Sequence, residues 1–193
     1  MSDGTLAWYE QHAAEYCERT LHADMSSPIA RFLDGLKPDG LILDLGCGSG
    51  RDTRRFLDLG YRVDAWDGSP AIARHASAYL GRAVSARTAQ SLEEVEQYDG
   101  IWACSSLLHL SRTEFVDVAR KIRSALRPSG RFYASLKCGA DDAVVGGRYF
   151  CFWTVEQVVS TLQGQCGLVV LASWTSPDEH RSDTTWINVL CTV

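Results

Sequence analysis

Acidic and glycine residues follow a short apolar run near position 45. Residues 41–45 read Leu-Ile-Leu-Asp-Leu, and glycines stand at positions 46, 48 and 50. Glycine lets the main chain turn sharply and leaves room for a ligand to approach the backbone. A buried strand that leads through such a turn into a helix is typical of a mononucleotide site at the carboxyl edge of a sheet. Residues 41–52 therefore predict a ligand site.

The spacing of these glycines bears on which ligand is bound. The dinucleotide fingerprint is Gly-x-Gly-x-x-Gly, whereas the third glycine here comes one residue early, and no Gly-Lys-Ser/Thr of a P-loop follows. The carboxylate of Asp44 would repel a pyrophosphate and attract an ammonium group. These features favour S-adenosylmethionine, which carries an ammonium and a sulfonium but no phosphate. A dinucleotide site and a plain tight turn are the alternatives.

A second acid, Asp67, ends the next apolar stretch. It lies about 20 residues after Gly46, the offset at which an acid holds ribose hydroxyls in nucleotide-binding folds. Ser69 precedes Pro70 and can itself cap the following helix, which leaves Asp67 available for a ligand. We expect Asp67 to bind ribose, with capping of the helix as the alternative.

Two later segments complete the predicted site. Gln90, or a backbone group beside it, can bond the adenine edge, and a solvated loop is the alternative. Residues 98–104 predict a strand whose carboxyl end brings Cys104 and Ser105 to the methionine part of the ligand. His109 follows and is the candidate general base, because its ordinary pKa lies near neutrality. A structural hydrogen bond at a helix start is the alternative for His109.

Alternating strands and helices must position these side chains. The pattern predicts a doubly wound α/β sheet, whose last strand is antiparallel because no crossover helix precedes it. Residues 138–149 are polar and glycine-rich and predict a mobile loop. The expected helices cover about 6–21, 26–36, 52–59, 70–80, 111–126 and 154–162, and the expected strands 41–45, 61–66, 82–86, 98–104, 131–136, 168–173 and 186–191.

Composition limits the remaining function classes. The chain has 193 residues and a formal net charge of −5, without the basic footprint that nucleic-acid binding needs. No apolar run approaches the roughly 18 to 20 residues of a membrane span, and no signal peptide is recognisable. The seven cysteines are scattered without a Cys-x-x-Cys pair, which favours reduced thiols in a cytoplasmic protein and no metal site.

Tyr9, Ala13, Tyr16 and Thr20 fall on one face of the predicted first helix. This face either packs on the core or forms a lid whose tyrosines contact the ligand. The residues that could line the acceptor pocket are Lys137, Arg148, Trp174 and Arg181, and a surface or packing role is the alternative for each. The positive groups among them would suit an anionic acceptor.

The motifs at 44–50, 67, 98–109 and 126–130 occur in the order seen in class I S-adenosylmethionine-dependent methyltransferases, which the chain resembles. More narrowly, it resembles the bacterial tellurite-resistance-type small methyltransferases, through 9–20, 50–52, 102–104, 147–150 and 186–189. The resemblance implies a Rossmann-like three-layer sandwich with a seven-stranded, mostly parallel sheet, its last strand antiparallel, and an N-terminal helical lid.

The resemblance also implies a single domain over 1–193, with helices or lid at 1–37 and the Rossmann-like core at 38–193. It implies methyl transfer from S-adenosylmethionine to a small-molecule acceptor by a monomer or homodimer. A nicotinamide-dependent oxidoreductase and a non-catalytic cofactor-binding protein are the alternatives. Besides the catalytic candidate His109, the expected cofactor-binding residues are Tyr9, Tyr16, Thr20, Asp44, Gly46, Cys47, Gly48, Arg51, Asp52, Asp67, Gly68, Ser69, Gln90, Ser91, Leu92, Cys104 and Ser105.

Overall fold

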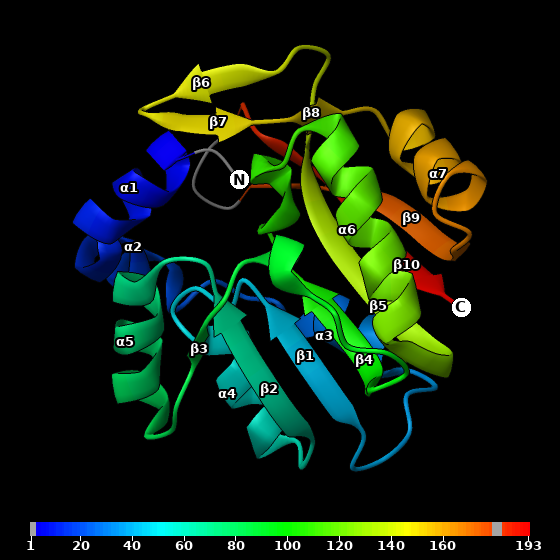
Figure 1. Ribbon diagram of the computed structural model, residues 1–193, viewed down its shortest axis with the longest axis horizontal. Helices are drawn as coiled ribbons and strands as arrows, with labels where there is room; N and C mark the ends of the chain where they lie inside the picture. The colour runs from blue at the N-terminus through cyan, green and yellow to red at the C-terminus, as the bar shows by residue number, and fades with distance from the viewer. Residues whose placement is uncertain (1–2, 179–182) are drawn as a thin grey trace.

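The computed structural model describes residues 3–178 and 183–193. Its main sheet has the strand order β3-β2-β1-β4-β5-β10-β9, and a short strand, β8, also pairs with β5 (Figure 1). The predicted seven-stranded Rossmann-like path is confirmed, and β8 adds an eighth strand. The strands are β1 (Leu41–Leu45), β2 (Arg62–Asp67), β3 (Ser85–Ala86), β4 (Tyr98–Ala103), β5 (Leu126–Cys138), β8 (Phe152–Trp153), β9 (Val169–Pro177) and β10 (Thr185–Thr192).

The direction of the strands follows the prediction. β1 pairs in parallel with β2 and β4, and β4 with β5. β10 is antiparallel to both of its neighbours, β5 and β9, and lies between them. Because the chain first adds β2 and β3 on one side of β1 and then β4 on the other, the topology reverses between β1 and β4. Ligands of open α/β sheets bind at such a switch point.

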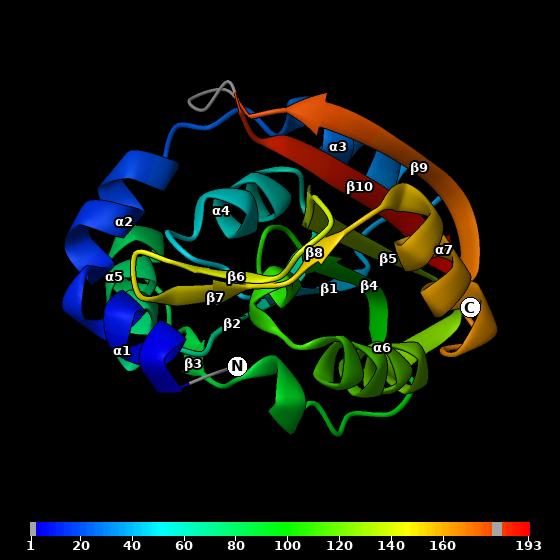
Figure 2. The ribbon, with the colours of Figure 1, turned by 90° about the horizontal axis from the view of Figure 1, so that it is seen from above.

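Helices cover both faces of the sheet (Figure 2). α3 (Ser26–Leu33) and α4 (Arg51–Asp58) pack through Phe32 and Phe56 on one face, against Trp102 and Tyr133. α6 (Arg112–Ala125) and α7 (Val155–Gly164) cover the other face and bury the largest apolar cluster. α5 (Pro70–Leu80) follows β2, and its Tyr79 is 45% exposed. Among the described residues, no helix combines the length and apolarity of a membrane span.

The N-terminal segment forms two helices, so the predicted single helix over 6–21 is wrong. α1 (Asp3–Gln11) and α2 (Ala13–Thr20) meet at His12, whose φ of −116° and ψ of 18° depart from helical values. The His12 ring stacks on Trp8, with 4.4 Å between ring centroids, and bonds the Trp8 carbonyl. α1 and α2 lie beside α5 (Figure 2), whereas α3 belongs to the core.

A β-hairpin occupies the predicted mobile loop at 138–149, and that prediction is wrong. β6 (Ala143–Val145) and β7 (Arg148–Phe150) pair antiparallel through a two-residue turn. Gly146 and Gly147 have φ of 55° and 80°, as a type I′ turn requires. The hairpin reaches α1 (Figure 1), where the Tyr149 amide donates to Thr5 Oγ1 at 3.0 Å.

Candidate cofactor and acceptor site

The glycine turn lies between the ends of β1 and β4. The Gly46 and Cys47 amides both donate to the Trp66 carbonyl at 2.8 Å. A Cβ on Gly46 would lie 2.3 Å from Cβ of Ser106, so only glycine fits there. Ser106 Oγ donates to the Leu45 carbonyl at 2.6 Å. The turn is thereby held from β2 on one side and from the segment after β4 on the other.

Asp67 stands at the end of β2 beside this turn. Its two carboxylate oxygens accept from the amides of Gly48 (3.0 Å) and Ser69 (2.9 Å). Among the ion pairs of the described residues, none includes Asp67. Burial raises the pKa of Asp67 to about 6, although the two amide bonds oppose that rise. Ser69 Oγ caps α5 by accepting from the Ile72 amide, which leaves carboxylate lone pairs of Asp67 for a ligand.

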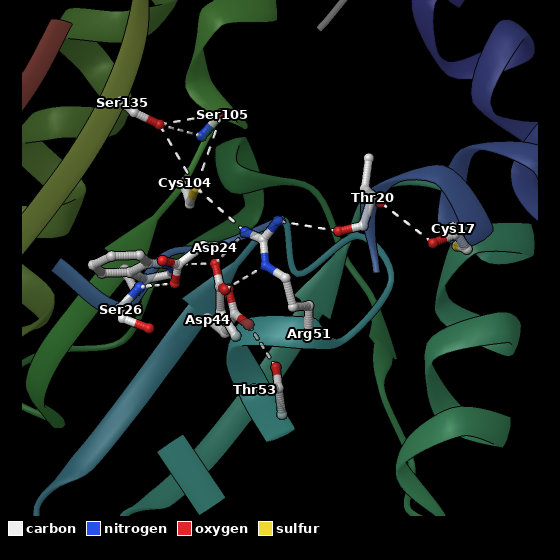
Figure 3. A network of polar contacts seen from close by, with 12 residues as sticks. Cys17, Thr20, Asp24, Ser26, Asp44, Arg51, Thr53, Cys104, Ser105 and Ser135 are labelled. Atoms are coloured by element: carbon white, nitrogen blue, oxygen red, sulfur yellow. Dashed lines mark hydrogen bonds and ion pairs between the residues drawn. The ribbon is translucent and has the colours of Figure 1, made fainter. Parts of the chain in front are cut away.

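A buried acidic network supports the other side of the turn (Figure 3). Arg51 donates to both oxygens of Asp52 at 2.7 and 2.9 Å, and Trp102 Nε1 donates to Asp52 at 2.9 Å. Asp44 accepts from the Thr53 hydroxyl. Burial and the nearby charge of Asp52 raise the pKa of Asp44. Two carboxylates thus share one guanidinium, which favours a cation at this edge of the sheet.

Arg51 also ties this network to α2 and to β4. Its guanidinium donates to the Thr20 carbonyl at 3.1 Å and contacts Cys104 Sγ at 3.8 Å (Figure 3). Burial, with Asp52 nearby, raises the pKa of Cys104 to about 11, so its thiol is neutral at pH 7. Ser105 has a φ of 54°, and its amide donates to Ser135 Oγ at 2.8 Å. The backbone therefore turns sharply where β4 ends.

Residues 90–92 are engaged in other contacts. The Gln90 amide nitrogen donates to Glu114 at 3.1 Å, and Ser91 Oγ donates to the Thr88 carbonyl at 2.8 Å. Leu92 is fully buried in the core cluster. Gln90 Oε1 is buried without a hydrogen-bond partner, so it is the side-chain atom of this segment with unused capacity.

Two tyrosines of α1 and α2 lead from the glycine turn toward His109. A Cβ on Gly48 would lie 3.5 Å from the Tyr16 ring, and the rings of Tyr16 and Tyr9 meet edge to face with centroids 5.0 Å apart. Tyr9 Oη then lies 2.8 Å from His109 Nε2. Glu10 fastens this segment to α5 by accepting from Ser69 Oγ (2.6 Å) and the Ala71 amide (2.9 Å).

His109 is held by both ring nitrogens. Nδ1 lies 2.6 Å from the Tyr149 carbonyl, which can only accept, so Nδ1 carries the proton and Tyr9 donates to Nε2. Burial, together with the charges of Arg148 and Lys137, lowers the pKa of His109 to about 4. The ring is 2% exposed. In this arrangement His109 is neutral at pH 7 and its basic nitrogen faces Tyr9.

Two of the four predicted acceptor-side residues join His109. Arg148 Cζ lies 4.0 Å from the Trp8 ring centroid and 5.2 Å from that of Phe150, and Lys137 Nζ lies 3.9 Å from the Phe150 ring centroid. Trp174 lies elsewhere, beside Tyr133 and under Arg31. Arg181 lies outside the described residues. We call Tyr9, His109, Lys137, Arg148 and Phe150 the His109 cluster.

Several supporting residues escaped the sequence interpretation. Glu10 and Ser135 carry no motif, and their roles depend on contacts between segments far apart in sequence. The hairpin that delivers the Tyr149 carbonyl and Phe150 did have a signal. Val144-Val145 and Arg148-Tyr149-Phe150 flank two consecutive glycines, a pattern that predicts a tight hairpin.

Comparison with known proteins finds similarity to methyltransferases in sequence and in fold. Residues 42–130 match the family described as a methyltransferase domain. Over 61 residues, or 31% of this chain, the sequence is 38% identical to the 2-O-methyltransferase NoeI of Sinorhizobium fredii. That match spans 25% of NoeI, so the chain aligns with about a quarter of the curated relative's length.

Solved structures share the fold over nearly the whole chain. The 1,6-didemethyltoxoflavin-N1-methyltransferase of Burkholderia thailandensis, with bound 1,6-didemethyltoxoflavin and S-adenosylhomocysteine, has a TM-score of 0.81 at 22% identity, covering 98% of this chain and 87% of its own. The N-methyltransferase NodS of Bradyrhizobium japonicum, in complex with S-adenosylhomocysteine, has a TM-score of 0.77 at 16% identity, covering 98% of each chain.

Proposed function

We propose that the chain is a class I S-adenosylmethionine-dependent methyltransferase, as its match to a methyltransferase domain and its fold support, and that it transfers the cofactor's methyl group to a small-molecule acceptor. The observation that carries the proposal is the unbalanced negative charge at the switch point. Asp44, Asp52 and Asp67 gather around the glycine turn with Arg51 as the cation of the network. A ligand with an ammonium and a sulfonium fits this field, whereas a pyrophosphate does not.

Each part of the site has a proposed role toward the cofactor. Asp67 would accept from the ribose hydroxyls with the lone pairs that Gly48 and Ser69 leave unused. The Gly46–Gly48 backbone and Asp44 would hold the methionine end, near Cys47 and Ser105. Gln90 Oε1 is the candidate adenine contact, beside Gly68, Ser91 and Leu92. Arg51 and Asp52 would act chiefly by charge, because they already bind each other, and Tyr16 and Thr20 would close the lid.

S-adenosylmethionine, when bound, supplies an activated methyl carbon, so the protein has to orient the reactants and exclude water. Alignment of two reactants supplies roughly 7 to 11 kcal/mol in favourable model systems. In this chain Tyr16 of α2 lies against Gly48 of the turn, and Tyr9 of α1 packs on Tyr16. Tyr9 lies between the turn and His109, where the acceptor would meet the methyl group.

We propose that His109 acts through Tyr9. Its Nε2 accepts a hydrogen bond from the Tyr9 hydroxyl. The oxygen lone pairs of Tyr9 are then available to accept a hydrogen bond from the methyl acceptor. A base whose pKa is about 4 accepts a proton only from a strongly acidic group. An attacking hydroxyl becomes such a group as its oxygen takes up the methyl, whereas a deprotonated acceptor needs no base.

We make further proposals on the cellular location, the domain extent, the acceptor class and the oligomeric state. All seven cysteines are free, which supports a reducing, cytoplasmic setting. We propose a single domain over 1–193, in which α1 and α2, rather than the whole of 1–37, form the lid. The acceptor is proposed to be a small molecule rather than nucleic acid, and the protein a monomer or homodimer. The tellurite-resistance-type resemblance supports a small methyltransferase and leaves the acceptor's atom open.

Calorimetry with S-adenosylhomocysteine and with a nicotinamide dinucleotide tests the cofactor. We expect S-adenosylhomocysteine to bind and the dinucleotide not to bind; tight binding of the dinucleotide alone would overturn the proposal. Turnover is then measured as S-adenosylhomocysteine released from S-adenosylmethionine with a panel of hydroxyl, thiol and amine acceptors. Cofactor binding without release on any acceptor would favour a non-catalytic cofactor-binding protein.

A further inference from the structure

Arg148 is a cation without an acidic partner. Among the ion pairs of the described residues, none includes Arg148. Its Nε is buried and has no hydrogen-bond partner. The guanidinium lies on aromatic rings instead, 4.0 Å from the Trp8 centroid and 5.2 Å from that of Phe150. Ring faces attract a cation more weakly than a carboxylate does, so this charge is only partly compensated.

The neighbours of Arg148 are fixed in place. Its Cζ lies 5.8 Å from the Tyr9 ring centroid, and the Tyr9 hydroxyl donates to His109. His109 is in turn anchored on the Tyr149 carbonyl, one residue after Arg148 in β7. The chain Arg148–Tyr9–His109 therefore links the hairpin, the lid and the end of β4. A ligand group bound by Arg148 would lie within reach of the Tyr9 oxygen.

The positive charge around Arg148 also acts on the neighbouring His109 ring. After burial, the charges of Arg148 and Lys137 are among the causes that lower the pKa of His109. The glycine turn, by contrast, gathers Asp44, Asp52 and Asp67. The two ends of the site thus prefer opposite charges, a cation at the turn and an anion at the hairpin.

Resting on the proposed methyl transfer, we infer that Arg148 binds a carboxylate of the methyl acceptor. The planar guanidinium presents N–H groups that match two carboxylate oxygens. S-adenosylmethionine itself also carries a carboxylate that a guanidinium could bind. Tyr9 and Tyr16 stand between Arg148 and the glycine turn, which assigns Arg148 to the acceptor. The acceptor class is therefore a small carboxylic acid whose nucleophilic atom approaches Tyr9 while its carboxylate is held by the hairpin.

Binding of benzoate and of benzamide, its neutral isostere, tests this assignment in protein saturated with S-adenosylhomocysteine. We expect wild-type protein to bind benzoate at least about tenfold more tightly than benzamide, as a charge-assisted pair allows. Arg148→Gln should remove this preference, and Arg148→Lys should keep part of it. Arg31→Gln is the matched control, because the exposed Arg31 also stacks on a tryptophan, Trp174, but outside the His109 cluster.

Equal affinity of wild-type protein for the two probes overturns the inference, whatever the variants do. A second arm compares S-adenosylhomocysteine with 5′-methylthioadenosine, which lacks the carboxylate. If Arg148→Gln weakens only S-adenosylhomocysteine, Arg148 binds the cofactor and the acceptor assignment is wrong. If wild-type protein binds neither nucleoside, the proposed function fails; the benzoate preference of the ligand-free protein then still decides whether Arg148 forms a carboxylate site.

Discussion

Asp67 carries a charge that the surrounding residues do not balance. Its pKa of about 6 lies well above the ordinary carboxyl value, because burial is only partly offset by the Gly48 and Ser69 amides. Cofactor affinity should therefore fall as the pH drops from 7 to 5, since the protonated acid is a poorer acceptor for two ribose hydroxyls. Calorimetric titration with S-adenosylhomocysteine at several pH values measures this dependence.

Asp67→Asn is expected to lower the affinity for S-adenosylhomocysteine at least about tenfold at pH 7, because each hydrogen bond to a charged group contributes about 1.5–3 kcal/mol. The variant should also lose the pH dependence between 7 and 5. Asp64→Asn, three residues earlier on β2 and also half-buried, is the control and should bind like wild type. Unchanged affinity in Asp67→Asn would reassign Asp67 to holding the turn.

His109 makes a separate prediction about folding. Its pKa is lowered to about 4 by burial and by Arg148 and Lys137, while Tyr9 occupies Nε2. Between pH 6.5 and 4 the unfolded chain binds a proton that the folded ring refuses, so His109 makes stability fall as the pH decreases through this window. The loss amounts to about 2 kcal/mol between pH 7 and 5.

Urea unfolding of wild type and His109→Asn at pH 7 and pH 5 tests this expectation. The free energy of unfolding of wild type minus that of the variant should be smaller at pH 5 than at pH 7 by about that amount, because asparagine does not titrate. Asp67 contributes a pH dependence of the opposite sign, but it does so equally in both proteins, so it cancels when the two unfolding free energies are subtracted. His75→Asn, on the exposed face of α5, controls for loss of any histidine. An equal gap at both pH values would show that His109 titrates normally.

At the residue scale, the sequence indicated which strand ends come together, but not how the side chains there are bonded. Asp44 and Asp67 lie at the carboxyl ends of β1 and β2, and His109 comes after β4. These strand ends share one edge of the sheet, so the proximity follows from topology alone. The second bond of His109, to the Tyr149 carbonyl, comes from a hairpin 40 residues away. That contact depends on packing, and periodicity contains no information about it.

At the element scale, the proposed lid of α1 and α2 is held on α5 by a small number of contacts. Glu10 accepts from Ser69 Oγ and the Ala71 amide, and these bonds lower its pKa. Glu10→Ala should release α1 from α5, accelerate proteolysis within residues 3–20 and weaken S-adenosylhomocysteine a few-fold. Glu15→Ala is the control, because Glu15 is exposed and pairs only with Arg19 at 3.9 Å. Equal protease sensitivity in both variants would show that other contacts hold the lid.

The elements of the core were predicted well, and those at its margin were not. Capping boxes at Ser111 and Thr154 begin α6 and α7 where the sequence indicates. No glycine or proline marks the break at His12 in the sequence. The break is accompanied instead by a side-chain contact between His12 and Trp8. The β6–β7 hairpin lies in a polar stretch, which by itself is typical of a loop, and its only signal is the turn chemistry of Gly146-Gly147.

At the scale of the whole molecule, cofactor binding and folding are linked. A ligand at 100 times its dissociation constant stabilises the folded state by about 2.7 kcal/mol, which for a domain of this size corresponds to a melting shift of roughly 5–10 °C. We expect S-adenosylhomocysteine to produce this shift and a nicotinamide dinucleotide at equal concentration to produce none. Thermal unfolding followed by circular dichroism measures it; similar shifts with both compounds would mean that binding is not selective.

The position of β10 has a consequence for how the chain folds during synthesis. Residues 185–192 lie between β5 and β9, and they pair with β5 over seven positions from Arg131 to Lys137. Until the ribosome has released these residues, β5 keeps an open edge and β9 has no neighbour in the main sheet. A nascent chain stalled before residue 185 would therefore expose an unpaired apolar strand, the kind of surface that aggregates or recruits chaperones.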